Sequence, residues 1–121
     1  MRLLCADDED DIRTILELAL GLDPGIEAEI VGSADELLAR AGAGHYDAFI
    51  LDGMMPGIDG YEACRRLKAD PATAATPVIF LTAKTQRGEV ARALAIGAAA
   101  CLTKPFDPLT LAADVRSALT R

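Results

Sequence analysis

The chain has 121 residues, which suits one domain with a substantial core and is too short for two. Hydrophobic residues make up 51% and charged residues 26%, a balance typical of folded, soluble proteins rather than disordered ones. The net charge is −7 and the sequence has no Lys/Arg cluster, so we do not expect direct nucleic-acid binding.

The apolar segments and the cysteines indicate the cellular compartment of the protein. No apolar run approaches the roughly 20 residues of a membrane span, so we expect no membrane contact. The first apolar segment, residues 3–6, is too short for a signal peptide, and acidic residues follow it at once. Cys5, Cys64 and Cys101 are odd in number and lack metal or redox spacing. They predict reduced, mostly buried thiols in a cytoplasmic protein.

Short apolar segments alternate with segments of helical periodicity along the whole chain. The expected strands are residues 3–6, 27–31, 48–51, 77–82 and 99–102. Helical patterns follow each of them, at about 12–20, 33–41, 59–69, 86–96 and from 107 onward. This alternation predicts a parallel sheet with helices on both faces. Residues 27–31 alternate polar and apolar, which is typical of an edge strand and favours the order 2-1-3-4-5. We therefore predict an α/β, doubly wound, flavodoxin-like (βα)5 fold.

Helix starts carry their own local signals. Ser33 with Glu36, and the similar pair formed by Asp59 and Glu62, predict capping arrangements for the second and third helices. Asp107 as N-cap, with proline at the next position, predicts the start of the last helix.

Five polar side chains stand at or just past the ends of four expected strands. They are Asp7 and Asp8 after the first, Asp52 after the third, Thr82 at the end of the fourth and Lys104 after the fifth. In the order 2-1-3-4-5 these strands are neighbours, so we expect the five groups to converge. Close carboxylates repel by ~4 kcal/mol per pair at an effective dielectric of ~20, so the site favours cations. Lys104 supplies one, and Mg²⁺ on oxygen ligands is the expected second.

This arrangement predicts a definite chemistry. With its neighbouring acids neutralised, Asp52 can attack a phosphoryl group and form an acyl phosphate. Mg²⁺ and Lys104 can neutralise charge on the phosphoryl oxygens, while the Thr82 hydroxyl donates to one of them. A carboxylate here could instead only ligate a metal or cap its loop, and an isolated acid pair usually does no more than cap a helix.

The chain resembles a receiver domain of the response-regulator family of two-component signalling, over essentially its whole length. The motifs that carry the resemblance are Asp7-Asp8, Leu51-Asp52, Met55-Pro56, Asp59-Gly60, Leu81-Thr82-Ala83, Gly97-Ala98 and Lys104-Pro105-Phe106. Each is modest alone, but their order and spacing are specific. The resemblance implies that residues 1–121 form one phosphoacceptor domain. The chain leaves no room for an output domain, so we expect a stand-alone receiver; one cut from a longer regulator fits equally well.

The resemblance also implies roles for the site residues. Asp52 accepts a phosphoryl group from a histidine kinase's phosphohistidine or from a histidine phosphotransfer protein. Asp7, Asp8, Asp52 and the backbone carbonyl of Met54 hold Mg²⁺, and Thr82 and Lys104 bind the phosphoryl oxygens. The bond after Lys104 is often cis in such domains. The protein is then a signalling switch, not a turnover enzyme. We expect it to act by contacting a protein through the face formed by the fourth helix, fifth strand and fifth helix, or to pass phosphoryl groups along a relay.

One position departs from the family pattern. Receivers usually carry Tyr or Phe three residues before the site lysine, and this chain has Cys101. We therefore expect output through the loop after Thr82 and the fourth helix. Met54 and Lys84 stand two residues past Asp52 and Thr82, at positions through which family members tune phosphoryl lifetime.

Other classes fit less well. A haloacid-dehalogenase-type hydrolase needs an acid where Met54 stands, and a flavin or nucleotide binder needs a phosphate-cradling glycine loop after the first strand. Gly42-Ala43-Gly44 is not a dinucleotide fingerprint, and His45 is expected to be a surface residue. The main alternative is a degenerate receiver that binds partners without phosphorylation. The intact acids, Thr82 and Lys104 argue against it, while Cys101 keeps it open.

Overall fold

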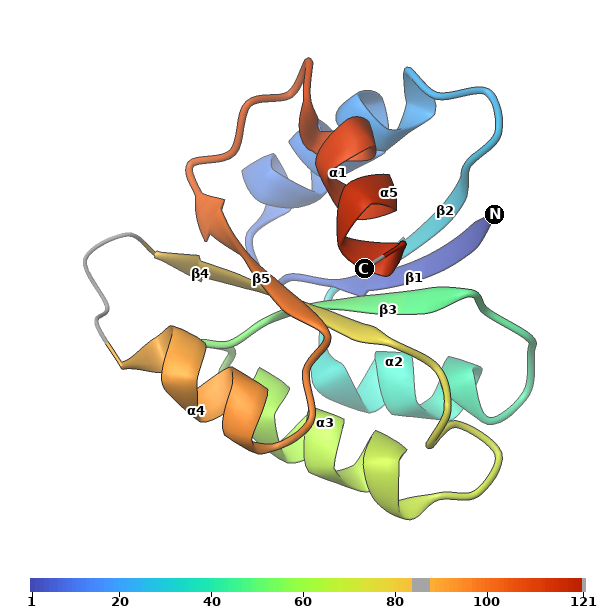
Figure 1. The fold of residues 1–121 in the computed structure, drawn as a ribbon, viewed down its shortest axis with the longest axis vertical. Coiled ribbons are helices and arrows are strands. Elements are labelled where there is room, and N and C mark those ends of the chain that lie inside the picture. Colours follow the sequence, from blue (N-terminus) through green and yellow to red (C-terminus); the bar gives the residue numbers. More distant parts are fainter. Residues whose placement is uncertain (84–87, 121) are drawn as a thin grey trace.

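The computed structural model describes residues 1–83 and 88–120 (Figure 1). Its five strands form one parallel sheet in the order β2-β1-β3-β4-β5. The strands are β1 (Arg2–Ala6), β2 (Glu27–Val31), β3 (Ala48–Asp52), β4 (Val78–Ala83) and β5 (Ala100–Lys104). The helices are α1 (Asp10–Gly21), α2 (Ala34–Ala41), α3 (Gly60–Ala69), α4 (Glu89–Ala95) and α5 (Leu111–Leu119). The predicted fold class and strand order are confirmed.

Helices cover both faces of the sheet, as Figure 1 shows, with α1 and α5 on one face and α2, α3 and α4 on the other. Each face has its own buried core. Beneath α1 and α5 the core includes Leu3, Leu16, Ile50, Ile79 and Val115. The opposite core includes Leu4, Leu37, Phe49, Cys64, Leu67 and Phe80. Because β3 lies between two covered strands and contributes to both cores, all five of its residues are buried. The edge strand β2 is mostly half-buried, as its alternating pattern predicts.

The register of the sheet places the polar residues at one edge. Ala6 of β1 lies opposite Leu51 of β3, and an aspartate follows each of these two residues along the chain. On the other side of β3, Asp52 lies opposite Leu81. Lys104 lies opposite Ala83, at the ends of β5 and β4. The carboxyl ends of β1, β3, β4 and β5 therefore meet at the same edge.

Local signals fix most helix starts. Ser33 accepts the Glu36 N–H at 3.2 Å, and Asp59 accepts the Glu62 N–H at 2.9 Å, which confirms both predicted caps. The predicted start of the last helix is wrong, because α5 begins at Leu111 rather than after Asp107.

Asp107 instead organises a turn ahead of α5. Its side chain accepts the Leu109 N–H at 2.9 Å, and its carbonyl accepts the N–H groups of Thr110 and Leu111. The aspartate and proline signals therefore act before the helix and not at its first turn.

Helix α4 starts at Glu89, after Gly88 with a φ of 89°, and ends before Gly97. Residue 86, where the sequence predicts the helix start, lies outside the described residues. The bond between Lys104 and Pro105 is cis, as expected. Within residues 1–83 and 88–120, the helices are too short to span a bilayer.

Candidate functional site

Lys104 joins two aspartates from different strands at the carboxyl edge of the sheet. Its Nζ lies 2.7 Å from Asp7 Oδ2 and 3.1 Å from Asp52 Oδ2. The side chain of Asp7 is 0% exposed, that of Asp52 is 8% exposed and that of Lys104 is 15% exposed. The predicted convergence of these residues from β1, β3 and β5 is confirmed. The lysine is a largely desolvated cation between two acids, which is the arrangement that a buried carboxylate pair needs.

The surroundings of Asp52 and Lys104 shift both pKa values. Burial raises the pKa of Asp52 above its ordinary value, against the opposing effects of the Met54 N–H and Lys104. For Lys104, burial alone would lower the pKa, but the hydrogen bond to Asp7 and the charges of both aspartates outweigh it and raise the pKa. Lys104 therefore stays charged, while the Asp52 carboxylate remains costly to ionise. A second cation would stabilise it.

The loop after β3 folds tightly around Asp52. The Met54 N–H donates to Asp52 Oδ1 at 3.1 Å, and the Gly60 N–H donates to the Gly53 carbonyl at 3.3 Å. A Cβ at Gly60 would lie 2.3 Å from the Asp52 carbonyl oxygen, so only glycine permits this close approach. Met55 is buried in the core and anchors the middle of the loop. The loop thereby holds the Asp52 side chain with one oxygen on Met54 and the other on Lys104.

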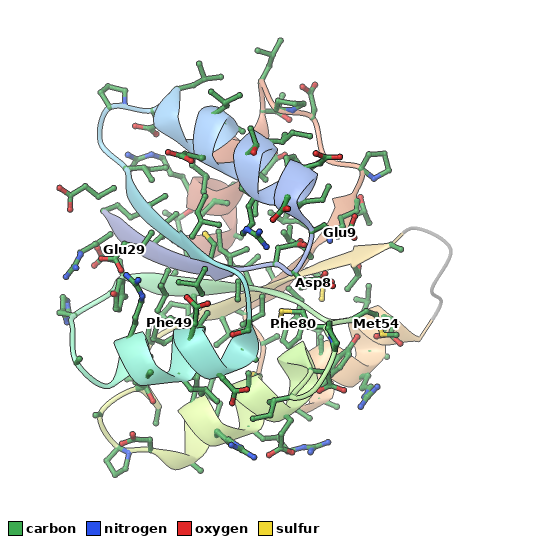
Figure 2. All side chains as sticks on the ribbon, turned by 180° about the vertical axis from the view of Figure 1, so that it is seen from behind. Asp8, Glu9, Glu29, Phe49, Met54 and Phe80 are labelled. Atoms are coloured by element: carbon green, nitrogen blue, oxygen red, sulfur yellow. The ribbon has the colours of Figure 1, made fainter. Side chains whose placement is uncertain are left out.

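Four acidic side chains gather at this edge. Asp7, Asp8, Glu9 and Asp52 each offer a carboxylate oxygen, and these oxygens lie within 4.8 Å of one another. Figure 2 shows Asp8, Glu9 and Met54 at the same end of the molecule, away from Glu29. Mg²⁺ takes oxygen ligands at about 2.1 Å in octahedral geometry, so its opposed ligands stand about 4.2 Å apart. The spacing and the all-oxygen donor set fit this ion.

A pocket of about 170 Å³ opens beside Asp52. Thr82 lies in its wall and is 5% exposed. The remaining lining residues are Glu9, Gly53, Met54, Tyr61, Leu81, Ala83, Glu89 and Lys104. The pocket therefore contains a carboxylate, a hydroxyl and an ammonium group, which together suit a tetrahedral anion.

The sequence matches a known family. A family model described as the response regulator receiver domain matches residues 3–116. The chain belongs to the response-regulator receiver family. Response regulators are components of two-component systems and receive phosphoryl groups from histidine kinases. The receiver's acidic cluster and its pocket are compatible with the Mg²⁺ site typical of such domains.

Relatives of this receiver are longer proteins. It is 41% identical over 120 residues to the response regulator PleD of Caulobacter vibrioides, covering 99% of this chain and 26% of that protein. It is 36% identical to the phosphate regulon transcriptional regulatory protein PhoB of Rhizobium meliloti, covering 99% of this chain and 52% of that protein. The chain thus spans about a quarter to a half of the length of these curated relatives.

Solved structures agree with the receiver fold. A response regulator from Chloroflexus aurantiacus superposes with a TM-score of 0.91 at 36% identity, covering 99% of this chain and 98% of that one. The chemotaxis protein CheY4 of Vibrio cholerae superposes with a TM-score of 0.87 at 31% identity, covering 97% of both chains.

Most of the residues singled out from the sequence lie at this site. Asp7, Asp52 and Lys104 are in contact, and Thr82 lines the adjoining pocket. Asp8 is exposed, and its carboxylate belongs to the acidic cluster. The Met54 side chain is 57% exposed, while its backbone N–H holds Asp52. Lys84 lies outside the described residues.

Three further residues of the receiver site were not predicted. Glu9 follows the acid pair directly, and its place in the sequence could have indicated a role there. Tyr61 and Glu89 reach the pocket from α3 and α4. Nothing in their spacing distinguishes them from ordinary helix residues, because only the packing of α3 and α4 against β4 brings them to Asp52.

Proposed function

We propose that this receiver accepts a phosphoryl group on Asp52 from a phosphohistidine donor. The observation that carries the proposal is the Asp52 carboxylate itself, which ends the central strand, faces the pocket and is bound by Lys104 at 3.1 Å. A carboxylate oxygen attacks phosphorus and forms a P–O bond as the P–N bond of the donor breaks. The electron pair of that bond stays on the imidazole nitrogen, and the product on the protein is an aspartyl phosphate.

Lys104 and Thr82 stabilise the transferred group. The Lys104 ammonium already bridges Asp7 and Asp52, so it lies close to the charge that the phosphoryl oxygens bring. Thr82 supplies a hydroxyl donor from the pocket wall, at the end of the neighbouring strand. The Met54 N–H holds the orientation of Asp52 while the other oxygen reacts.

Asp7, Asp8 and Asp52, together with the Met54 carbonyl, are the proposed Mg²⁺ ligands. What supports this assignment is the spacing of the acidic oxygens and the burial of Asp7 and Asp52. Bound Mg²⁺ supplies positive charge that neutralises the phosphoryl oxygens. The burial that raises the pKa of Asp52 is the same feature that favours a second cation beside it.

The phosphorylated protein acts as a switch rather than as a turnover enzyme. Its donor is a histidine kinase or a histidine phosphotransfer protein, and its target is a protein that reads the face of α4, β5 and α5. Supporting this choice of face, Val90 and Leu94 of α4 are 44% and 49% exposed, and Leu109, just before α5, is 82% exposed. The net charge of −7 disfavours nucleic acid as a direct partner. The free thiols of Cys5, Cys64 and Cys101 fit a reducing cytoplasm.

Intact mass spectrometry tests the proposal directly. The protein is incubated with a small phosphodonor, such as phosphoramidate, with Mg²⁺ or with EDTA. Wild type with Mg²⁺ should gain the mass of one phosphoryl group, and Asp52→Asn should gain none. Asp35→Asn, which alters an exposed acid on α2, is the matched control and should behave as wild type. No gain on wild type would reject the proposal and favour a receiver that binds partners without phosphorylation.

A further inference from the structure

Tyr61 on α3 lies between the strand that carries Thr82 and the helix that follows it. The residue is 0% exposed, and its ring stacks on Phe80 of β4 with centroids 5.1 Å apart and planes 21° apart. The guanidinium carbon of Arg92 on α4 lies over the same ring, 3.9 Å from its centroid. Phe80, Tyr61 and Arg92 thus form a continuous chain of contacts from β4 to α4.

The Tyr61 hydroxyl reaches the phosphoryl-accepting pocket. It lies 3.0 Å from the point that a Cβ on Gly53 would occupy, directly after Asp52. It is buried and, among residues 1–83 and 88–120, has no hydrogen-bond partner. A buried hydroxyl without a hydrogen-bond partner raises the free energy of its conformation relative to a conformation that supplies a partner. Tyr61 is therefore sensitive to small rearrangements of the pocket wall.

Strand β5 provides no aromatic ring at this place. Cys101, three residues before Lys104, lies opposite Phe80 in the β4–β5 register and packs against the same core. A thiol of this size cannot swing between two packed positions as a ring does. The aromatic contact with Phe80, near the end of β4, is made instead by Tyr61 of α3.

We propose that Tyr61 couples Asp52 phosphorylation to α4, acting as a positioning residue through its contact with Arg92. The inference rests on the proposed phosphorylation of Asp52. When Thr82 moves toward a phosphoryl group, the end of β4 moves with it, and the stacked ring of Tyr61 follows Phe80. Since the Arg92 guanidinium lies over that ring, the displacement reaches α4 through a charged, planar contact.

Glu89 gives α4 a second link to the pocket. It lies one turn before Arg92, and its Oε2 is buried at the pocket, without a hydrogen-bond partner within the described part of the chain. A phosphoryl dianion placed on Asp52 repels this carboxylate, which favours movement of the start of α4 away from the site. Repulsion at Glu89 and the stacked contact at Arg92 therefore act on the same helix.

The test compares amide chemical shifts with and without beryllofluoride and Mg²⁺, a stable mimic of the phosphorylated site. In wild type, residues 90–95 should shift together with Gly53 and Thr82. Arg92→Ala should reduce the shifts of residues 90–95 by about twofold or more, because it removes the contact that carries the displacement to α4. Gly53 and Thr82 should still shift as in wild type. Arg66→Ala, which removes an exposed arginine that pairs with Glu62, is the control and should change neither set.

Tyr61→Phe separates the hydroxyl from the ring. It keeps the contacts of the ring with Phe80 and Arg92, so the α4 shifts should persist. The apparent affinity for beryllofluoride should fall by about threefold to tenfold, because the hydroxyl that gains a partner in the activated state is removed. Unchanged α4 shifts in Arg92→Ala, with unchanged affinity in Tyr61→Phe, would overturn the inference. The proposed function fails in a different way, because wild type itself would then neither respond to beryllofluoride nor gain phosphoryl mass.

Discussion

Replacing Lys104 by methionine removes the charge at the centre of the site and keeps most of the side chain's packing. Its Nζ bridges Asp7 and Asp52 at 2.7 and 3.1 Å. Without it, two aspartates whose side chains are 0% and 8% exposed face each other with no cation between them. We expect Lys104→Met to be destabilised at neutral pH in EDTA, and to lose most phosphoryl transfer to Asp52.

The structure sets the size of this effect. Two unit charges about 4 Å apart repel by ~4 kcal/mol at an effective dielectric of ~20. Removing one partner of a buried ion pair typically costs about 3–5 kcal/mol. The lysine is partly exposed, and water can reach the gap it leaves, so we expect a loss of about 2–4 kcal/mol in the free energy of unfolding.

Urea denaturation in EDTA and in saturating Mg²⁺ measures this loss. Because Mg²⁺ can neutralise the same acids, it should recover at least half of the stability lost in Lys104→Met. Lys68→Met is the matched control, since Lys68 Nζ donates to the carbonyls of Ala74 and Thr76, away from the site. The stability that Lys68→Met loses should not depend on Mg²⁺. Equal losses for Lys104→Met in EDTA and in Mg²⁺ would refute the claim that lysine and metal serve the same carboxylates.

Three further changes test the geometry around the site and at the other end of the fold. Asp52→Asn should be more stable than wild type at pH 7 in EDTA. Burial raises the pKa of Asp52, so the protonated carboxyl favours the folded state at low pH, and this stability is lost as pH rises through the raised pKa. Thermal unfolding should therefore show that the stability difference between Asp52→Asn and wild type shrinks in acid. Gly60→Ala should lose about 1–3 kcal/mol in urea denaturation because its Cβ meets the Asp52 carbonyl oxygen, whereas Gly21→Ala, with nothing within 4 Å, should lose none. Arg116→Gln should be slightly less stable than wild type at pH 7. Its side-chain hydrogen bond to Asp23 lowers the pKa of that carboxyl, so the difference should vanish as pH falls through the lowered value, and a cost that persists in acid would contradict this.

The fold follows from short-range patterns that tertiary packing does not override. Residues 48–51 are apolar throughout because β3 is covered on both faces, and this pattern alone indicates a central strand. The alternation in β2 marks the edge. Once the order of the strands is known, the carboxyl ends of the strands that carry Asp52 and Lys104 must lie at the same edge of the sheet. The convergence of the site was therefore predictable from strand topology and chemistry.

Other features depend on contacts between distant elements. The turn of residues 107–110 resembles a helix start, but the regular helix begins only at Leu111. Tyr61 and Glu89 occupy positions that any helix residue could fill, and their place beside Asp52 follows from how α3 and α4 pack on β4. Sequence spacing within one helix carries no signal of this kind.

The central claim is that Asp52 itself becomes an acyl phosphate. Borohydride reduces an acyl phosphate to an alcohol, which converts a phosphorylated aspartate to homoserine and leaves a free carboxylate unchanged. The protein is treated with phosphodonor and Mg²⁺, reduced, digested and mapped by tandem mass spectrometry. We expect homoserine at position 52, dependent on both donor and Mg²⁺. Homoserine at another acid, such as Asp7 or Asp8, or at none, would contradict it.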